Sequence, residues 1–141
     1  MDRTALLAPV FVLAAWTGAI LLLLAFRRVR AGVQRRVRIR DFRLGEAPGL
    51  PDELLLPNRN YMNLLELPLL FYVVCLLALT MGAVTPLAVA LAWTYTGLRV
   101  VHSLIHVTYN RVMHRFAAFA LSNAVLAGLW VVVGQQVFGG R

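Results

Sequence analysis

Two clusters of polar side chains interrupt stretches of the sequence that are otherwise apolar. The first cluster, Arg59, Asn63 and Glu66, has the spacing i, i+4, i+7, which places all three residues on one face of a helix. Glu66 lies about two helical turns, or roughly 10 Å, from the nearest polar segment. Since a carboxylate at that depth in a membrane is costly unless it is paired or hydrated, we expect a partner or a polar cavity beside Glu66.

The second cluster contains Arg99, His102, His106 and Asn110, whose spacing of i, i+3, i+7 and i+11 again selects one helical face. Arg99 lies about 16 Å from the polar end of this helix, where an unpaired Arg costs at least about 2.5–3.5 kcal/mol. Glu66 is the only acid inside a predicted membrane span, so we expect it to pair with Arg99. The sequence leaves open whether the two residues meet within one subunit or between subunits.

These clusters have a structural and a functional interpretation. In the structural one, a buried ion pair determines how the helices pack. In the functional one, the Arg, His, Asn and Tyr side chains line a polar cavity with more positive groups than one Glu neutralises, which suits a carboxylate or phosphate ligand. A metal site is not predicted: His102 and His106 have a usable i, i+4 spacing, but Arg99 and Arg111 disfavour a cation, and no third ligand is evident.

The elements that carry these clusters are predicted to be membrane-spanning helices. The chain has 141 residues, 60% hydrophobic and 14% charged, whereas soluble domains have about 45–50% apolar and about 25% charged residues. The apolar run of residues 6–26 is too long for a signal peptide, and basic residues follow it instead of preceding it. We therefore expect a single domain, residues 1–141, of the all-α membrane class, with an up-down bundle of four transmembrane helices over residues 4–26, 58–81, 86–110 and 116–138.

The connecting segments determine the expected orientation. Eight of the fourteen Arg residues lie between Arg27 and Arg43, in a predicted loop over residues 27–57, and the turn before the last helix adds Arg111 and Arg115. The positive-inside rule places both basic segments in the cytoplasm and both termini outside. A basic cluster beside a membrane span is typical of a topology determinant that contacts anionic lipid, so we do not expect nucleic acid as a partner. Pro68, inside the second predicted helix, should bend it or leave a carbonyl group free.

Both clusters resemble signatures of a known family. The stretch Arg59-Asn-Tyr-Met-Asn63-Leu-Leu-Glu66-Leu-Pro68 resembles the second-helix motif of the MAPEG family, the membrane-associated proteins in eicosanoid and glutathione metabolism. The stretch from Arg99 through His102, His106 and Tyr109 to Arg115 is similar to the end of that family's third helix, in the form of the short bacterial members. The match covers the chain in length, helix count and topology.

The resemblance implies a homotrimer in a membrane, expected to be the bacterial inner membrane, with glutathione bound between subunits on the cytoplasmic side. It implies a thiolate, stabilised by an Arg, that attacks a lipophilic electrophile arriving from the bilayer. The family's thiolate-stabilising Arg falls near Met113, so its flanking residues Arg111 and Arg115 are the catalytic candidates. The residues matched to glutathione binding are Arg59, Asn63, Glu66, Arg99, His102, His106 and Tyr109, with the two His residues standing where the eicosanoid enzymes usually have Tyr.

Three functions are compatible with the sequence. The first is a glutathione-dependent transferase or peroxidase acting on lipophilic electrophiles. The second is a non-catalytic lipid-binding or scaffold protein of the same fold, which the absence of Arg at position 113 favours. The third is a small four-helix exporter with Glu66 as proton carrier, which the buried Arg99 and the long basic loop disfavour.

Overall fold

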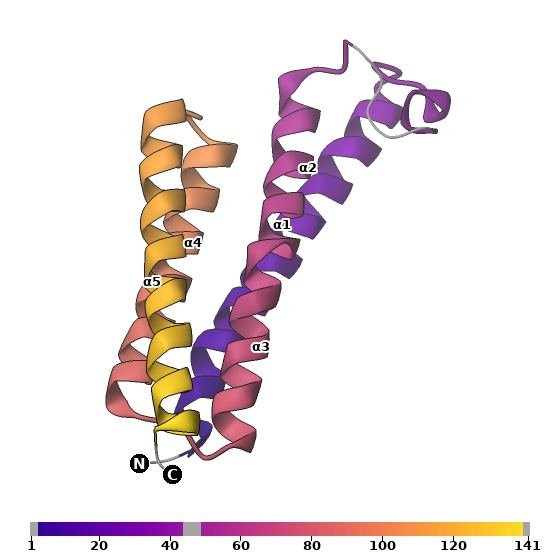
Figure 1. Cartoon of the computed structure of the whole chain (residues 1–141). Helices are drawn as coiled ribbons and strands as arrows, with labels where there is room; N and C mark the ends of the chain where they lie inside the picture. Colours follow the sequence, from indigo (N-terminus) through magenta and orange to yellow (C-terminus); the bar gives the residue numbers. More distant parts are fainter. Residues whose placement is uncertain (1–2, 44–48, 140–141) are drawn as a thin grey trace.

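The computed structural model describes residues 3–43 and 49–139, and all regular structure within these ranges is helical. Residues 44–48 of the predicted basic loop and residues 140–141 lie outside the described part. The helices, in chain order, are η1 (Arg3–Leu6), α1 (Leu7–Val33), η2 (Ile39–Phe42), α2 (Asp52–Leu65), α3 (Leu67–Thr80), α4 (Pro86–Val107) and α5 (Val112–Phe138). Because α2 and α3 follow each other along one bent rod (Figure 1), the long helices form the predicted four-membered up-down bundle.

The predicted membrane character is confirmed. Within the described ranges, three helical stretches are long and apolar enough to cross a membrane: Thr4–Val33, Asp52–Thr80 and Val112–Phe138. The remaining long helix, α4, carries Arg99, His102 and His106 among its apolar residues. The protein is thus an all-helical integral membrane protein, and its polar helix packs against the three apolar ones.

The basic segment contains more helix than predicted. Helix α1 continues seven residues beyond position 26, to Val33, and α2 begins at Asp52 instead of residue 58. Arg is a good helix former, and its long side chain carries the charge away from an apolar surface, so the Arg-rich stretch extends α1 without interruption. The predicted loop over residues 27–57 is therefore helical at both ends, with η2 between them.

Pro57 frees a backbone carbonyl group to which an Arg side chain donates a hydrogen bond. Pro57 lies inside α2 and has no N–H for the carbonyl of Glu53, which accepts a hydrogen bond from Arg27 Nη1 at 3.1 Å. The second interruption is at Glu66, whose ψ of −89° ends α2, and Pro68 occupies the first turn of α3. The predicted bend of the second rod is therefore present, two residues before Pro68.

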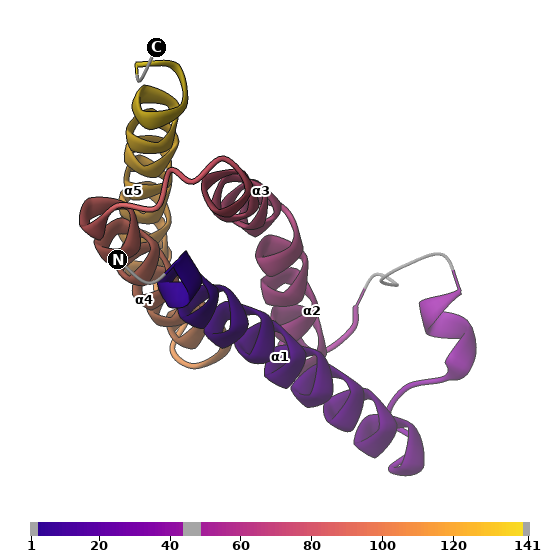
Figure 2. The ribbon, with the colours of Figure 1, turned by 90° about the horizontal axis from the view of Figure 1, so that it is seen from below.

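The hydrophobic core lies toward the end of the molecule that holds both termini. Phe71 of α3 stacks on Tyr95 of α4 with ring centroids 4.7 Å apart, and both side chains are fully buried. At the opposite end, α1 and α2 lean away from the α4–α5 pair (Figure 1). Seen from below in Figure 2, α1 starts beside α4 and then runs away from the α4–α5 pair. The bundle is therefore packed at one end and open at the other.

A buried polar contact joins three helices where the bundle begins to open. The hydroxyl oxygen of Ser103 on α4 accepts hydrogen bonds from Trp16 Nε1 of α1, at 2.9 Å, and from Asn60 Nδ2 of α2, at 2.7 Å. Ser103 and Asn60 are both fully buried. Because hydrogen bonds need specific distances and angles, this contact holds α1 and α2 at one height relative to α4.

Candidate functional site

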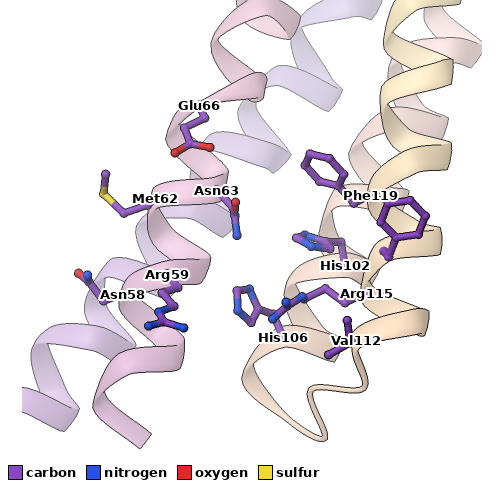
Figure 3. Close-up of a pocket in the computed structure, with 11 residues that line it drawn as sticks. Asn58, Arg59, Met62, Asn63, Glu66, His102, His106, Val112, Arg115 and Phe119 are labelled. Atoms are coloured by element: carbon purple, nitrogen blue, oxygen red, sulfur yellow. The ribbon is translucent and has the colours of Figure 1, made fainter. Parts of the chain in front are cut away.

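A cavity of about 600 Å³ lies between α2 and the α4–α5 pair, at the end of the bundle away from the termini (Figure 3). Ligand pockets typically have volumes of about 300–1,000 Å³. Its walls come from residues of α2, the break after α2, the last turns of α4 and the first turns of α5. They are Asn58, Arg59, Met62, Asn63, Glu66, His102, His106, Val112, Arg115, Phe116 and Phe119.

The wall formed by α2 carries the first polar cluster. Arg59, Asn63 and Glu66 all line the cavity, as expected from their shared helical face. Figure 3 shows Glu66 at one end of this wall and Arg59 toward the other, with Asn63 between them. Asn58, which the motif did not single out, also lines the cavity, and its side-chain oxygen accepts a hydrogen bond from Arg28 Nη2 at 3.1 Å. The cavity wall is thereby connected to the basic end of α1.

The opposite wall contains two buried histidines. His102 and His106 are 3% and 2% exposed, and their ring centroids are 5.8 Å apart. Nδ1 of His102 and both ring nitrogens of His106 have no hydrogen-bond partner among the described residues. Buried polar atoms are almost always hydrogen-bonded, so these nitrogens are suited to a polar ligand. Within the same residues, no group of three or more His, Cys, Asp or Glu side chains is placed to hold a metal ion.

Arg99 does not lie where the sequence predicted. Its side chain is fully buried, and its Nη2 donates a hydrogen bond to the main-chain carbonyl of Asn63, near the break at Glu66. Nε and Nη1 of Arg99 have no partner among the described residues, and Glu66 is exposed. The predicted ion pair between Arg99 and Glu66 therefore does not form within the described part of one subunit, and pairing between subunits stays a prediction. The helix end leaves carbonyl groups without intrahelical donors, and Arg99 donates to one of them.

Phe119 of α5 separates Arg99 from the cavity. The Arg99 guanidinium carbon lies 5.7 Å from the centroid of the Phe119 ring, which itself lines the cavity. The same ring lies 5.8 Å from the ring of His102. Arg99 therefore does not line the cavity itself. It contacts the Phe119 ring and the Asn63 carbonyl, which belong to residues that do, whereas the two histidines line the cavity directly.

The two catalytic candidates lie in different places. Arg115 lines the cavity, and its Nη1 donates a hydrogen bond to the side-chain oxygen of Asn110 at 2.8 Å. Arg111 is exposed at the start of α5 and lines a separate surface depression with Met113 and His114. Tyr109 is 57% exposed, and its hydroxyl lies 3.2 Å from Nδ1 of His114. The structure thus brings Arg115 to the cavity and leaves Arg111 and Tyr109 outside it.

Sequence patterns missed the apolar part of the cavity. Met62 could have been found from the face that the α2 motif defines, since it lies one helical turn from both Arg59 and Glu66. Val112, Phe116 and Phe119 recur at i, i+4, i+7 on α5, an apolar pattern that looks the same whether it faces lipid, core or ligand. Only the position of α5 opposite α2 assigns these residues to the cavity.

These features define an all-helical integral membrane protein that holds a polar cavity between its helices near one end of the bundle. The chain belongs to the MAPEG family, whose sequence profile matches residues 6–134. This match confirms the resemblance and covers every residue that lines the cavity. The protein is therefore a membrane protein of the type associated with glutathione and eicosanoid metabolism. No curated protein and no solved structure shows a significant match to the chain.

Proposed function

We propose that this protein is a glutathione-dependent transferase or peroxidase that acts on lipophilic electrophiles. The observation that carries the proposal is the cavity of about 600 Å³, in which charged and polar groups face one another across an opening with apolar sides. Family membership supports the same ligand, since MAPEG proteins are associated with glutathione.

The residues in the cavity fit the groups of glutathione. Glutathione carries two carboxylates, one ammonium group and a thiol. Arg59 and Arg115 suit the carboxylates or a thiolate, and Glu66 at the other end suits the ammonium group. The unpartnered nitrogens of His106 suit the peptide groups of the ligand. We therefore assign ligand binding to Arg59, Asn63, Glu66, His102 and His106.

Arg115 is the residue that we assign to the thiol. When bound, glutathione would supply a thiolate that forms a C–S bond with the electrophile, whose leaving group takes the bonding electron pair while water accepts the thiol proton. A fixed cation beside a thiol favours its charged form and lowers its pKa. Asn110 holds the Arg115 guanidinium through the 2.8 Å hydrogen bond, so Arg115 needs little reorganisation to act in this way.

The apolar side of the cavity supports a lipophilic second substrate. Met62, Val112 and Phe116 line the cavity and are also substantially exposed on the surface of the bundle. In a membrane, such residues border on lipid, so an apolar electrophile can approach from the bilayer while glutathione enters from the polar end. The cytoplasmic position of that end follows from the positive-inside rule and forms part of the proposal.

Ligand-dependent stability of the detergent-purified protein tests this function. Glutathione at about 100 times its dissociation constant should stabilise the folded state by about 2.7 kcal/mol, measured as a saturable rise in Tm. We expect Arg59→Gln to abolish most of this rise, because Arg59 lines the cavity. Arg40→Gln is the matched control, since Arg40 is an exposed Arg of η2 that lines none of the described cavities. No rise in the folded wild-type protein, or equal losses in both variants, would contradict the proposal.

A non-catalytic lipid-binding role is the second candidate, and one observation favours it. Position 113, where the family's thiolate-stabilising Arg falls, holds a Met that is 73% exposed and lies outside the cavity. An acyl chain could then occupy the apolar side of the cavity without any chemistry. Turnover of a model electrophile such as 1-chloro-2,4-dinitrobenzene, lost in Arg115→Gln, would exclude this candidate; glutathione binding without turnover would favour it.

A further inference from the structure

A second cavity, of about 450 Å³, lies at the junction of α1 and α2 and does not share a residue with the first. Its floor is apolar, with Ala31 and Leu54 almost fully buried. Its polar groups come from α1, from the turn after it and from the first turn of α2. The lining residues are Leu23, Phe26, Arg27, Arg30, Ala31, Gln34, Arg36, Glu53 and Leu54.

This second cavity lies where the uncharged run of α1 ends, the level at which we expect the membrane to change from hydrocarbon to headgroups. The uncharged run of α1 ends at Phe26, and Arg27 is the first charge after it. Leu23, Arg27, Arg30 and Gln34 follow one another at intervals of three or four residues, so they form one stripe along α1. At 1.5 Å per residue this stripe is about 16 Å long, enough to reach from the acyl region into the headgroup layer.

The charges in the second cavity are unbalanced. Three Arg side chains face a single carboxylate, that of Glu53, which is already paired with Arg36 at 2.6 Å. Arg27 is held by its hydrogen bond to the Glu53 carbonyl group. The side chains of Arg30 and Gln34 have no hydrogen-bond or ion-pair partner among the described residues. The cavity therefore offers cationic and amide donors with more positive charge than its one carboxylate neutralises.

We propose that the second cavity binds the phosphate of an anionic membrane lipid, with Arg30, Arg27 and Gln34 as donors to the headgroup and Leu23 and Phe26 against the start of the acyl chains. Guanidinium groups bind phosphate through paired N–H donors, and basic pockets at the polar end of membrane spans suit anionic headgroups. A soluble phosphate would satisfy the Arg residues equally well. The apolar floor favours the lipid, because acyl chains are stabilised by contact with apolar side chains and a soluble phosphate ion is not.

Native mass spectrometry of the delipidated protein in detergent tests the site, with dioleoyl phosphatidylglycerol and dioleoyl phosphatidylcholine as probes. We expect phosphatidylglycerol to bind more tightly than phosphatidylcholine. Arg30→Gln should weaken phosphatidylglycerol binding about tenfold, the effect of losing a hydrogen bond between charged groups, and should leave phosphatidylcholine binding unchanged. Arg30 is the first choice because its side chain has no partner to lose, whereas Arg27→Gln also removes a bond within the fold.

Arg40→Gln provides the matched control, with the same change of charge in the same basic segment but outside the second cavity. Unchanged phosphatidylglycerol binding in Arg40→Gln would support a specific site in the second cavity. Equal weakening in Arg30→Gln and Arg40→Gln would show that the lipid is attracted only by the net charge, and would overturn the proposal. Equal affinity for the two lipids would also overturn it. Complete displacement of phosphatidylglycerol by stoichiometric sn-glycerol 3-phosphate would assign the site to a soluble phosphate. Because neither probe contains a thiol, the result is independent of the glutathione proposal.

Discussion

The buried polar residues are of two kinds, and the difference separates structural from functional roles. Ser103 and Asn60 have partners on neighbouring helices, and their hydrogen bonds join α1, α2 and α4. The ring nitrogens of His106 have no partner among the described residues, although the side chain is 2% exposed. A satisfied buried group contributes to stability, whereas an unsatisfied one beside a cavity costs stability until a ligand binds.

Replacement of Ser103 by Ala tests the structural role of the buried polar residues that have hydrogen-bond partners. The variant loses the acceptor of two donors, the fully buried Asn60 Nδ2 and the half-buried Trp16 Nε1. Because an unsatisfied buried donor costs about 1–3 kcal/mol, we expect the free energy of unfolding to fall by at least about 1–3 kcal/mol. Reversible unfolding in mixed micelles, followed by circular dichroism, measures this change.

Ser122→Ala is the matched control for Ser103→Ala. Ser122 is equally buried, but its hydroxyl donates to the carbonyl of Phe119 in its own helix, at 2.8 Å. This hydrogen bond lies within α5 and joins no second helix, so we expect only a small decrease in the free energy of unfolding. Similar destabilisation in both variants would show that Ser103 acts through packing and not through its contacts between helices.

At the level of elements, the ends and interruptions of helices matter more than their interiors. The break at Glu66 divides the second rod and lies beside the carbonyl group to which Arg99 donates. The polar helix α4 has a well-formed start: Thr85 is extended, its side chain accepts a hydrogen bond from the backbone N–H of Ala88 at 3.1 Å, and Pro86 follows as the first helical residue. These features determine where α4 begins and hence where its His residues lie.

The cap of α4 gives a prediction at this scale. Thr85→Ala removes the side-chain acceptor for Ala88 N–H, so we expect a loss of about 0.5–2 kcal/mol in the free energy of unfolding. Thr85→Ser, which keeps the hydroxyl, should recover most of it. Thermal and chemical unfolding of the purified variants measure both effects.

Thr94→Ala is the control for the cap of α4. Thr94 is exposed in the middle of the helix, and its hydroxyl donates to Ala90 in the previous turn. Its replacement should change stability by no more than about 0.5 kcal/mol. If Thr85→Ala were as mild as Thr94→Ala, the start of α4 would not depend on its cap.

At the scale of the whole molecule, the open end of the bundle leaves Glu66 exposed although it lies within a helical stretch able to span the membrane. A carboxylate facing hydrocarbon is costly, so Glu66 must face water or another protein surface in the membrane. A neighbouring subunit that covers the cavity would provide such a surface. This supports the proposal, already implied by the family, of a homotrimer with its sites between subunits.

The mass of the purified protein tests the homotrimer. In a mild detergent, native mass spectrometry should give three times the chain mass of 15.7 kDa, because separation would expose the polar cavity walls to the detergent's hydrocarbon. Dilution below the subunit dissociation constant should release monomers and should weaken glutathione binding in parallel. A monomer that binds glutathione as tightly as the assembled protein would contradict sites between subunits.

The sequence alone determined much of this protein. Four long and largely apolar segments predicted an all-helical bundle, and their order put the basic segments at one end. The spacing of Arg59, Asn63 and Glu66 predicted that they share one helical face, and in the structure this face forms a wall of the cavity. These inferences succeed because helical periodicity is local: it depends on residues three or four positions apart.

Only the tertiary structure decided which faces meet. Helical spacing groups Arg99 with His102 and His106, but Arg99 turns to a backbone carbonyl of α2 while the histidines face the cavity. The expected pair of Arg99 and Glu66 does not form within the subunit: Arg99 donates to the Asn63 carbonyl beside the break, and the exposed Glu66 side chain lines the cavity. Spacing along one helix says which residues share a face, whereas the rotation and tilt of each helix against its neighbours depend on packing along the whole bundle.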